Sequence, residues 1–306
     1  MRLGIDLGGT KTEIIALEGS VVRARRRART PAHDYAATLR NIVDLVRGLE
    51  AELGQTGTVG IAMPGTLSPA TGLVKNANST WLNGQPLDRD LQALLQRPLR
   101  FANDADCFAL SEASDGAGAG ATGVFGVILG TGVGGGIVIH GRLLAGPNGI
   151  AGEWGHNPLP WPEAHELPGP TCYCGQRGCI ETWLSGPGLA RDHEKQTGER
   201  RDARTINRAA AAGDDQAMET LRRYAVRLAR ALAGIINVLD PETIVLGGGL
   251  SQLGHLYEAV PRLWGRYVFS DRVDTRLLPP CHGDSSGVRG AAWLWPDGEA
   301  AGTMRY

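Results

Sequence analysis

The stretch LGIDLGGTKTEIIAL (residues 3–17) places a glycine turn between two apolar runs. RLGID predicts a buried strand, and TEIIAL predicts a second strand directly after the turn. The stretch GVILGTGVGGGIVIH (residues 126–140) repeats this arrangement of strand, glycine-rich turn and strand. Because the two copies lie far apart in the chain, the pattern predicts a duplicated lobe rather than a solenoid of short repeats.

The rest of the chain alternates between predicted strands and helices, which is typical of an α/β protein. Small residues at 115–123 (DGAGAGATG) predict a flexible boundary between two lobes with a cleft between them. The predicted strands are VVRARRRA, TVGIAM (58–63), LRFAN (99–103) and TIVLG, the last of which enters a third glycine turn. The predicted helices are 34–53, one that begins at ADCFALSEA, a long one at about 215–238 and GVRGAAWLW (287–295), and PDGEAAGTMRY (296–306) predicts a frayed tail.

Composition excludes several classes of protein. The chain has 306 residues, of which 42% are hydrophobic, and a net charge of -1. These values predict a globular protein of two domains with no attraction for nucleic acid or an anionic membrane. The basic run Arg23 to Arg27 is interpreted as a solvated strand edge. No apolar run is long enough for a transmembrane helix, and the N-terminus does not resemble a signal peptide, so we expect a cytoplasmic protein with reduced thiols.

The three glycine turns suggest that backbone amides approach phosphate groups. They do not match a P-loop, because Gly9 is followed by Thr-Lys rather than Lys-Ser or Lys-Thr. Gly130, Gly132 and Gly135 do satisfy GxGxxG, but the residues that follow are strand-like, whereas a dinucleotide motif opens a helix. Each turn alone could be a β-hairpin without a ligand. Three of them together favour a nucleotide site.

Carboxylates at strand ends complete a site for phosphoryl transfer. Asp6 ends the first strand and could hold Mg²⁺ through water. Asp104 lies where a strand meets a helix, and there it could accept a proton from a substrate hydroxyl. The alternative is that Asp104 is an ordinary helix N-cap. The neighbouring Asn103, which can bind a second hydroxyl, favours the functional interpretation.

The stretch TCYCGQRGCIE (171–181) contains Cys172, Cys174 and Cys179, and His156 lies shortly before it. Three thiolates and one imidazole would complete a closed tetrahedral zinc site. The spacing is not the usual Cys-x2-Cys, so the pattern alone leaves zinc open beside a disulfide and a nucleophile. Reduced thiols weaken the disulfide interpretation, and the lack of a separate activating histidine weakens the nucleophile. Cys107 and Cys281 are expected to be buried small hydrophobic residues.

The motifs DLGGTK, GTGVGGG, GEWGH, CYCGQRGCIE and LGGGLS, in this order, resemble those of the ROK family (repressor, open reading frame, kinase). The resemblance covers residues 2 to about 296. It implies two actin-like (RNase H-like) lobes that hold ATP between them. We expect one lobe at 1–117 with the helix and tail at 290–306, and a second lobe at 118–289 that carries the metal. Since the first strand begins at residue 2, we expect the kinase branch rather than the DNA-binding repressors.

Within the kinases, VKNANSTWLNGQPLD (74–88) and HGDSSGVRGAAWLWP (282–296) resemble bacterial fructokinases, also described as manno(fructo)kinases. The resemblance implies transfer of the ATP γ-phosphoryl to the 6-hydroxyl of fructose, with mannose or glucose as further acceptors. The alternatives are a glucokinase or N-acetylglucosamine kinase of the same family, and a sugar- and nucleotide-binding protein without catalysis. Family members are often dimers, so a homodimer is a further expectation that no residue pattern demonstrates.

The resemblance also assigns roles to individual residues. Asp104 matches the catalytic base, and the zinc ligands match His156, Cys172, Cys174 and Cys179. The residues expected to hold sugar hydroxyls are Asn78, Asn103, Asp104, Glu153, His156 and Glu181. The residues expected around ATP and Mg²⁺ are Asp6, Gly8, Gly9, Thr10, Lys11, Thr131, Gly132, Gly248 and Gly249.

Overall fold

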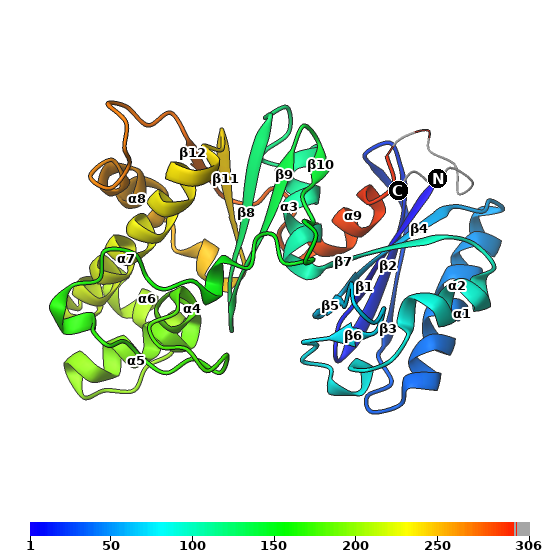
Figure 1. The fold of residues 1–306 in the computed structure, drawn as a ribbon, viewed down its shortest axis with the longest axis horizontal. Coiled ribbons are helices and arrows are strands. Elements are labelled where there is room, and N and C mark those ends of the chain that lie inside the picture. Colours follow the sequence, from blue (N-terminus) through cyan, green and yellow to red (C-terminus); the bar gives the residue numbers. More distant parts are fainter. Residues whose placement is uncertain (297, 299–306) are drawn as a thin grey trace.

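The computed structural model describes residues 1–296 and 298, and over this range the strands form two five-stranded sheets of the same layout. The strand order is β3-β2-β1-β4-β7 in the first sheet and β10-β9-β8-β11-β12 in the second. In each sheet the first three strands in chain order pair antiparallel and the remaining two add in parallel. The predicted duplication is confirmed, and Figure 1 shows the sheets in opposite halves of the molecule. Apart from Pro296 and Gly298, the predicted tail lies outside the described residues.

The first sheet consists of β1 (Arg2–Leu7), β2 (Lys11–Glu18), β3 (Val21–Arg29), β4 (Thr58–Met63) and β7 (Leu99–Asn103). The second consists of β8 (Gly123–Leu129), β9 (Val133–Ile139), β10 (Arg142–Leu143), β11 (Thr243–Gly247) and β12 (Arg276–Leu278), and a small hairpin joins β5 (Thr66–Leu67) to β6 (Val74–Lys75). The helices are α1 (Tyr35–Leu53), α2 (Leu87–Leu95), α3 (Asp104–Asp115), α4 (Ile180–Leu184), α5 (Gly186–Thr197), α6 (Ala203–Ala211), α7 (Asp215–Leu239), α8 (Leu256–Trp264) and α9 (Ser286–Trp293). Short 3₁₀ turns are η1 (Thr80–Leu82), η2 (Trp154–His156), η3 (Ala164–Glu166), η4 (Gly249–Gln252) and η5 (Gly283–Ser285).

Helix α1 covers the first sheet as its apolar spacing predicts. Asp34 caps its N-terminus by accepting a hydrogen bond of 2.8 Å from the N–H of Ala37. Gly54, with φ of 63°, ends the helix in the left-handed conformation. The buried face packs with β1 and β4 in one apolar core through Leu39, Ile42, Val46 and Leu49.

The basic run lies on β3, an edge strand with mostly exposed side chains, as expected. Arg25 and Arg27 both form salt bridges with Glu13 on the adjacent strand. Arg26 pairs with Glu52 of α1. Acidic neighbours therefore balance part of this charge and reduce its attraction for an anionic partner.

The second lobe is built around the long helix α7, which the sequence predicted at about 215–238. Its apolar face includes Leu228, Leu232 and Ile236, and it packs in one core with Phe125 and Leu246 of the second sheet. Helices α4, α5, α6 and α8 surround it, and the sequence analysis predicted none of these four. Among the described residues, no helix has both the length and the apolar character needed to cross a membrane.

Helices α3 and α9 lie between the two sheets (Figure 1). Although α3 follows β7 of the first sheet, it packs against β8 and β9 of the second. Helix α9 comes from the end of the chain and packs against β1 and β4. The two helices cross so closely that a Cβ at Gly290 would lie 1.7 Å from the carbonyl oxygen of Cys107. Only glycine fits there, so this close crossing fixes how α9, which packs on the first sheet, meets α3, which packs on the second.

Candidate active site and metal site

The junction of β7 and α3 separates the roles of Asn103 and Asp104. Asn103 is the N-cap, and its side-chain oxygen accepts a hydrogen bond of 2.6 Å from the N–H of Asp106. Asp104 is the first residue of the helix, and its Oδ1 accepts a hydrogen bond of 2.9 Å from the N–H of Ala105. Asp104 is therefore not the ordinary N-cap of the alternative interpretation. One of its oxygens is held by the helix, and its side chain stays exposed.

Several carboxylates gather at this junction. Burial raises the pKa of Asp104, although its side chain is exposed. Burial, and then the charges of Asp104 and Glu13, raise the pKa of Asp6 to about 6. Burial, followed by the charges of Glu153 and Asp104, raises the pKa of Asp106 to about 7.

These shifts indicate that Asp6, on β1, and Asp104, the first residue of α3, lie close enough for their carboxylates to repel one another. A divalent cation would offset this repulsion, so the donor set fits Mg²⁺ held near Asp6. The exposed Lys11 lowers the pKa of Asp6 and supplies a positive charge at the same place.

The first glycine turn is a closed hairpin between β1 and β2. The N–H of Gly8 donates to the carbonyl of Lys11 at 3.0 Å, and the Thr30 hydroxyl donates to the carbonyl of Gly8 at 2.7 Å. The loop that carries the exposed Asn78 packs against this turn, since a Cβ at Gly9 would lie 3.0 Å from the hydroxyl oxygen of Ser79. Asn78 is thereby placed beside the first glycine turn.

The second and third glycine turns lie together at the end of the second sheet. In the second turn, the N–H of Gly130 donates to the carbonyl of Gly132 at 2.9 Å. In the third, Gly248 has φ of 77°, and a Cβ there would lie 2.4 Å from the carbonyl oxygen of Leu129, the last residue of β8. The structure therefore brings Thr131 and Gly132 close to Gly248 and Gly249.

Glycines 134–136 have a packing role in β9. A Cβ at Gly136 would lie 2.7 Å from the carbonyl oxygen of Ala105 in α3. A Cβ at Gly135 would lie 2.8 Å from Gly152 and from the Trp154 ring. These glycines let α3 approach one face of the strand and residues 152–154 approach the other. Because a strand follows the turn, the dinucleotide interpretation of GxGxxG is excluded.

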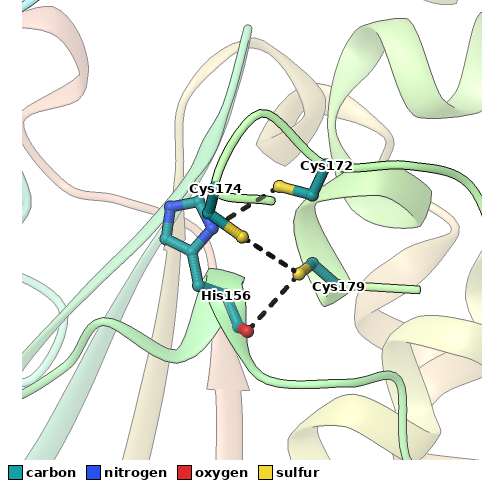
Figure 2. Close-up of side chains that lie close together, drawn as sticks. All are labelled: His156, Cys172, Cys174 and Cys179. Atoms are coloured by element: carbon teal, nitrogen blue, oxygen red, sulfur yellow. Dashed lines mark hydrogen bonds between the residues drawn. The ribbon is translucent and has the colours of Figure 1, made fainter. Parts of the chain in front are cut away.

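His156, Cys172, Cys174 and Cys179 form the cluster expected from the sequence (Figure 2). Their ligand atoms all lie within 4.8 Å of one another. The Sγ atoms of Cys174 and Cys179 are 3.6 Å apart, and Cys172 Sγ is 3.6 Å from Nδ1 of His156. Ligands at zinc–sulfur distance on a tetrahedron are about 3.8 Å apart, so the cluster fits one metal ion. All five cysteines are free thiols, which contradicts the disulfide alternative.

The metal loop, residues 153–181, contains the four residues of the cluster and is connected to the candidate sugar-binding residues. Glu181 lies two residues after Cys179, in the first turn of α4, and its Oε2 accepts a hydrogen bond of 2.9 Å from the N–H of Val133. Glu153 precedes η2, the turn that ends at the metal ligand His156. The structure thus brings Glu153, His156 and Glu181 to the start of β9, with Glu153 near the start of α3.

Sequence reasoning missed two residues here and misplaced one. Asp106, in FANDAD, interacts with both Asp104 and Glu153. Tyr173 lies between two metal ligands, and its hydroxyl is 3.0 Å from Nε2 of His156. The acidic run in FANDAD could have indicated Asp106, whereas no signal in the sequence indicated Tyr173. The expectation that Cys281 is buried was wrong, because this residue is exposed, whereas Cys107 is buried as expected.

The sequence model of the ROK family matches residues 2–298. The chain belongs to the ROK family. It is 40% identical over 299 residues to an N-acetyl-D-glucosamine kinase of Vibrio cholerae, covering 96% of this chain and 99% of the relative. It is also 40% identical over 308 residues to an N-acetyl-D-glucosamine kinase of Pectobacterium atrosepticum, covering 96% and 98%.

Solved ROK structures share the fold over nearly the whole chain. A ROK hexokinase from Thermus thermophilus has a TM-score of 0.85 and 31% identity, with 95% of this chain and 96% of that one covered. A ROK glucokinase from Streptomyces griseus, in complex with glucose and AMPPNP, has a TM-score of 0.74 and 27% identity, covering 97% and 99%. The α/β fold with two actin-like lobes is therefore confirmed, and the chain aligns with sugar kinases of the family over nearly its full length.

Proposed function

We propose that this ROK protein is an ATP-dependent hexose kinase that transfers the γ-phosphoryl group to the 6-hydroxyl of its sugar. The observation that carries the proposal is the state of Asp104. Its carboxylate is exposed at a helix start, burial raises its pKa, and the capping role falls to Asn103. A carboxylate in this state can take the proton of the attacking hydroxyl.

The glycine turns supply the binding side of the reaction. Backbone N–H groups at Gly8 to Thr10, and at Thr131 and Gly132, would hold the phosphates, and Lys11 would add a positive charge. Gly248 and Gly249 would lie against the adenosine. Mg²⁺, held near Asp6, would offset phosphate charge when bound.

The sugar would lie between α3 and the metal loop. The candidate sugar-binding residues offer both hydrogen-bond donors and hydrogen-bond acceptors. They are Asn78, Asn103, Glu153, His156 and Glu181. Sugar hydroxyls both donate and accept, so such a mixed set fits a neutral polyol. Zinc bound by the one histidine and three cysteines of the cluster would hold His156 and the segment before Glu181 on one rigid frame.

The relatives support a hexose kinase but not the expected preference for fructose. The curated relatives described above are both named N-acetyl-D-glucosamine kinases. We therefore propose N-acetylglucosamine as the first acceptor to test. Fructose remains the second candidate, because the segments 74–88 and 282–296 resemble fructokinases.

A coupled ADP-release assay with N-acetylglucosamine, fructose, mannose and glucose tests whether the protein is a hexose kinase and which sugar it prefers. Each phosphorylated product is identified. We expect turnover with at least one of these sugars and phosphate on its 6-oxygen. Hexose and ATP binding without any turnover would instead support a sensor without catalysis. The sugar with the greatest kcat/KM is the preferred acceptor.

A further inference from the structure

Tyr173 is an exposed residue whose position is defined by one contact. It lies in the metal loop between Cys172 and Cys174, and its side chain is 83% exposed. Its hydroxyl is 3.0 Å from Nε2 of His156, and the two rings meet edge to face with centroids 5.1 Å apart. A side chain this exposed gains little from burial, so the hydrogen bond is the specific interaction that it makes.

His156 has one ring nitrogen available to a sugar. Nδ1 faces Cys172 Sγ at 3.6 Å, on the side of the metal ligands. With Nδ1 engaged there, the ring proton lies on Nε2, and a single N–H donates well to one acceptor at a time. The group within hydrogen-bond distance of Nε2 is the Tyr173 hydroxyl.

The phenol also lies near the two other sugar-binding candidates of this loop. Its partner His156 lies three residues after Glu153, and the cluster residue Cys179 lies two residues before Glu181. Tyr173 consequently lies beside the segments that carry the three sugar-binding candidates Glu153, His156 and Glu181.

We propose that the Tyr173 hydroxyl occupies the place of a hexose hydroxyl on Nε2 of His156, and that a sugar must displace it in order to hydrogen-bond with His156. This inference rests on the proposed function. A hexose that offers an oxygen to Nε2 breaks the Tyr173 contact in order to form its own, whereas a sugar without that oxygen leaves Tyr173 in place. Tyr173 is then a specificity-determining residue that reduces the affinity gained by engaging His156.

Tyr173→Phe isolates the hydroxyl, because the phenylalanine ring keeps the edge-to-face contact. Hexose binding is measured by calorimetry without nucleotide, with the acceptor that the sugar panel identifies. We expect Kd to fall about threefold to tenfold, which corresponds to removing one competing hydrogen bond. Bound zinc, measured by metal analysis, stays equal to wild type. Tyr267→Phe, which alters a tyrosine that stacks on Trp161 outside the site, is the matched control and leaves Kd unchanged.

A series of deoxy analogues of the same hexose locates the competing hydroxyl. The gain in Tyr173→Phe should disappear for one analogue only, the one that lacks the hydroxyl facing His156. An unchanged or weaker affinity for the parent hexose in Tyr173→Phe overturns the inference, as does an equal gain for every analogue. If the wild-type protein phosphorylates a hexose while these results fail, the proposed function stands and only the role of Tyr173 falls. If the wild-type protein binds no hexose, both fall.

Discussion

The Oε2 atom of Glu181 accepts a hydrogen bond of 2.9 Å from the backbone N–H of Val133. Glu181 belongs to the segment that follows the metal ligand Cys179, and Val133 follows the second glycine turn. One carboxylate therefore connects the metal loop, which carries the sugar-binding candidates, with a turn expected to bind phosphate. A Cβ at Gly132 would lie 2.6 Å from this same oxygen, so the turn and the carboxylate are in direct contact.

Two substitutions of Glu181 should separate its proposed role in hexose binding from its role in positioning the second glycine turn. In Glu181→Gln the amide oxygen can still accept from Val133, so AMPPNP affinity should stay unchanged while hexose affinity falls. In Glu181→Ala the acceptor is lost, and the Kd for AMPPNP should also rise, by about threefold to tenfold. Calorimetry with each ligand alone gives both values. Unchanged AMPPNP binding in Glu181→Ala would show that this hydrogen bond does not position the phosphate turn.

Asp104→Asn should abolish the base while keeping the helix start, because an asparagine oxygen can still accept from the N–H of Ala105. We expect kcat to fall by about 10²- to 10⁴-fold, with the fold and bound metal retained. The pKa of Asp6 should also fall below about 6, since the charge of Asp104 contributes to raising it. Steady-state kinetics and carboxyl NMR titration measure the two effects. Turnover close to wild type would remove Asp104 from the mechanism.

Asp106 should make the protein less stable as pH rises. Its pKa is raised from 3.8 to about 7 in the folded protein, so between these values the folded state binds more protons than the unfolded state. The free energy of unfolding therefore falls across this window as pH increases. Asp106→Asn should remove that decline and gain stability relative to wild type between about pH 4.5 and about pH 7.5.

Urea unfolding at these two pH values tests the prediction for Asp106. Asp271→Asn, at an exposed position in the segment between α8 and β12, is the control for a generic loss of charge. A constant difference between wild type and Asp106→Asn at both pH values would contradict a raised pKa at this site.

The sequence predicted the parts of the fold that local pattern determines. The two strand-turn-strand units, α1 and α7 have strong apolar periodicity, and the structure contains all of them. The short helices α4, α5, α6 and α8 were not predicted, since their burial depends on contacts with α7 and the second sheet rather than on local pattern. The packing of α3 across to the second sheet likewise follows from tertiary contacts and close-fitting glycines.

For the candidate site, the sequence indicated which residues take part but not how their pKa values are shifted or which side chains contact one another. The four candidate metal ligands come together as expected because they lie in two short segments. The raised pKa values of Asp6 and Asp106 result first from burial, and then from carboxylates that folding brings together from distant parts of the chain. The contact of Tyr173 with His156 depends on the path of the metal loop, which no residue pattern encodes.

Removal of the metal should damage hexose binding before nucleotide binding. The ion would tie His156 to the segment that precedes Glu181, whereas the first and third glycine turns lie in hairpins and strands outside the metal loop. Titration with a zinc chelator should weaken hexose affinity by about tenfold or more while AMPPNP affinity changes less. Cys174→Ser should reproduce the loss, and Cys281→Ser, an exposed thiol outside the cluster, should not. Hexose affinity that survives complete metal removal would show that the cluster does not support the sugar site.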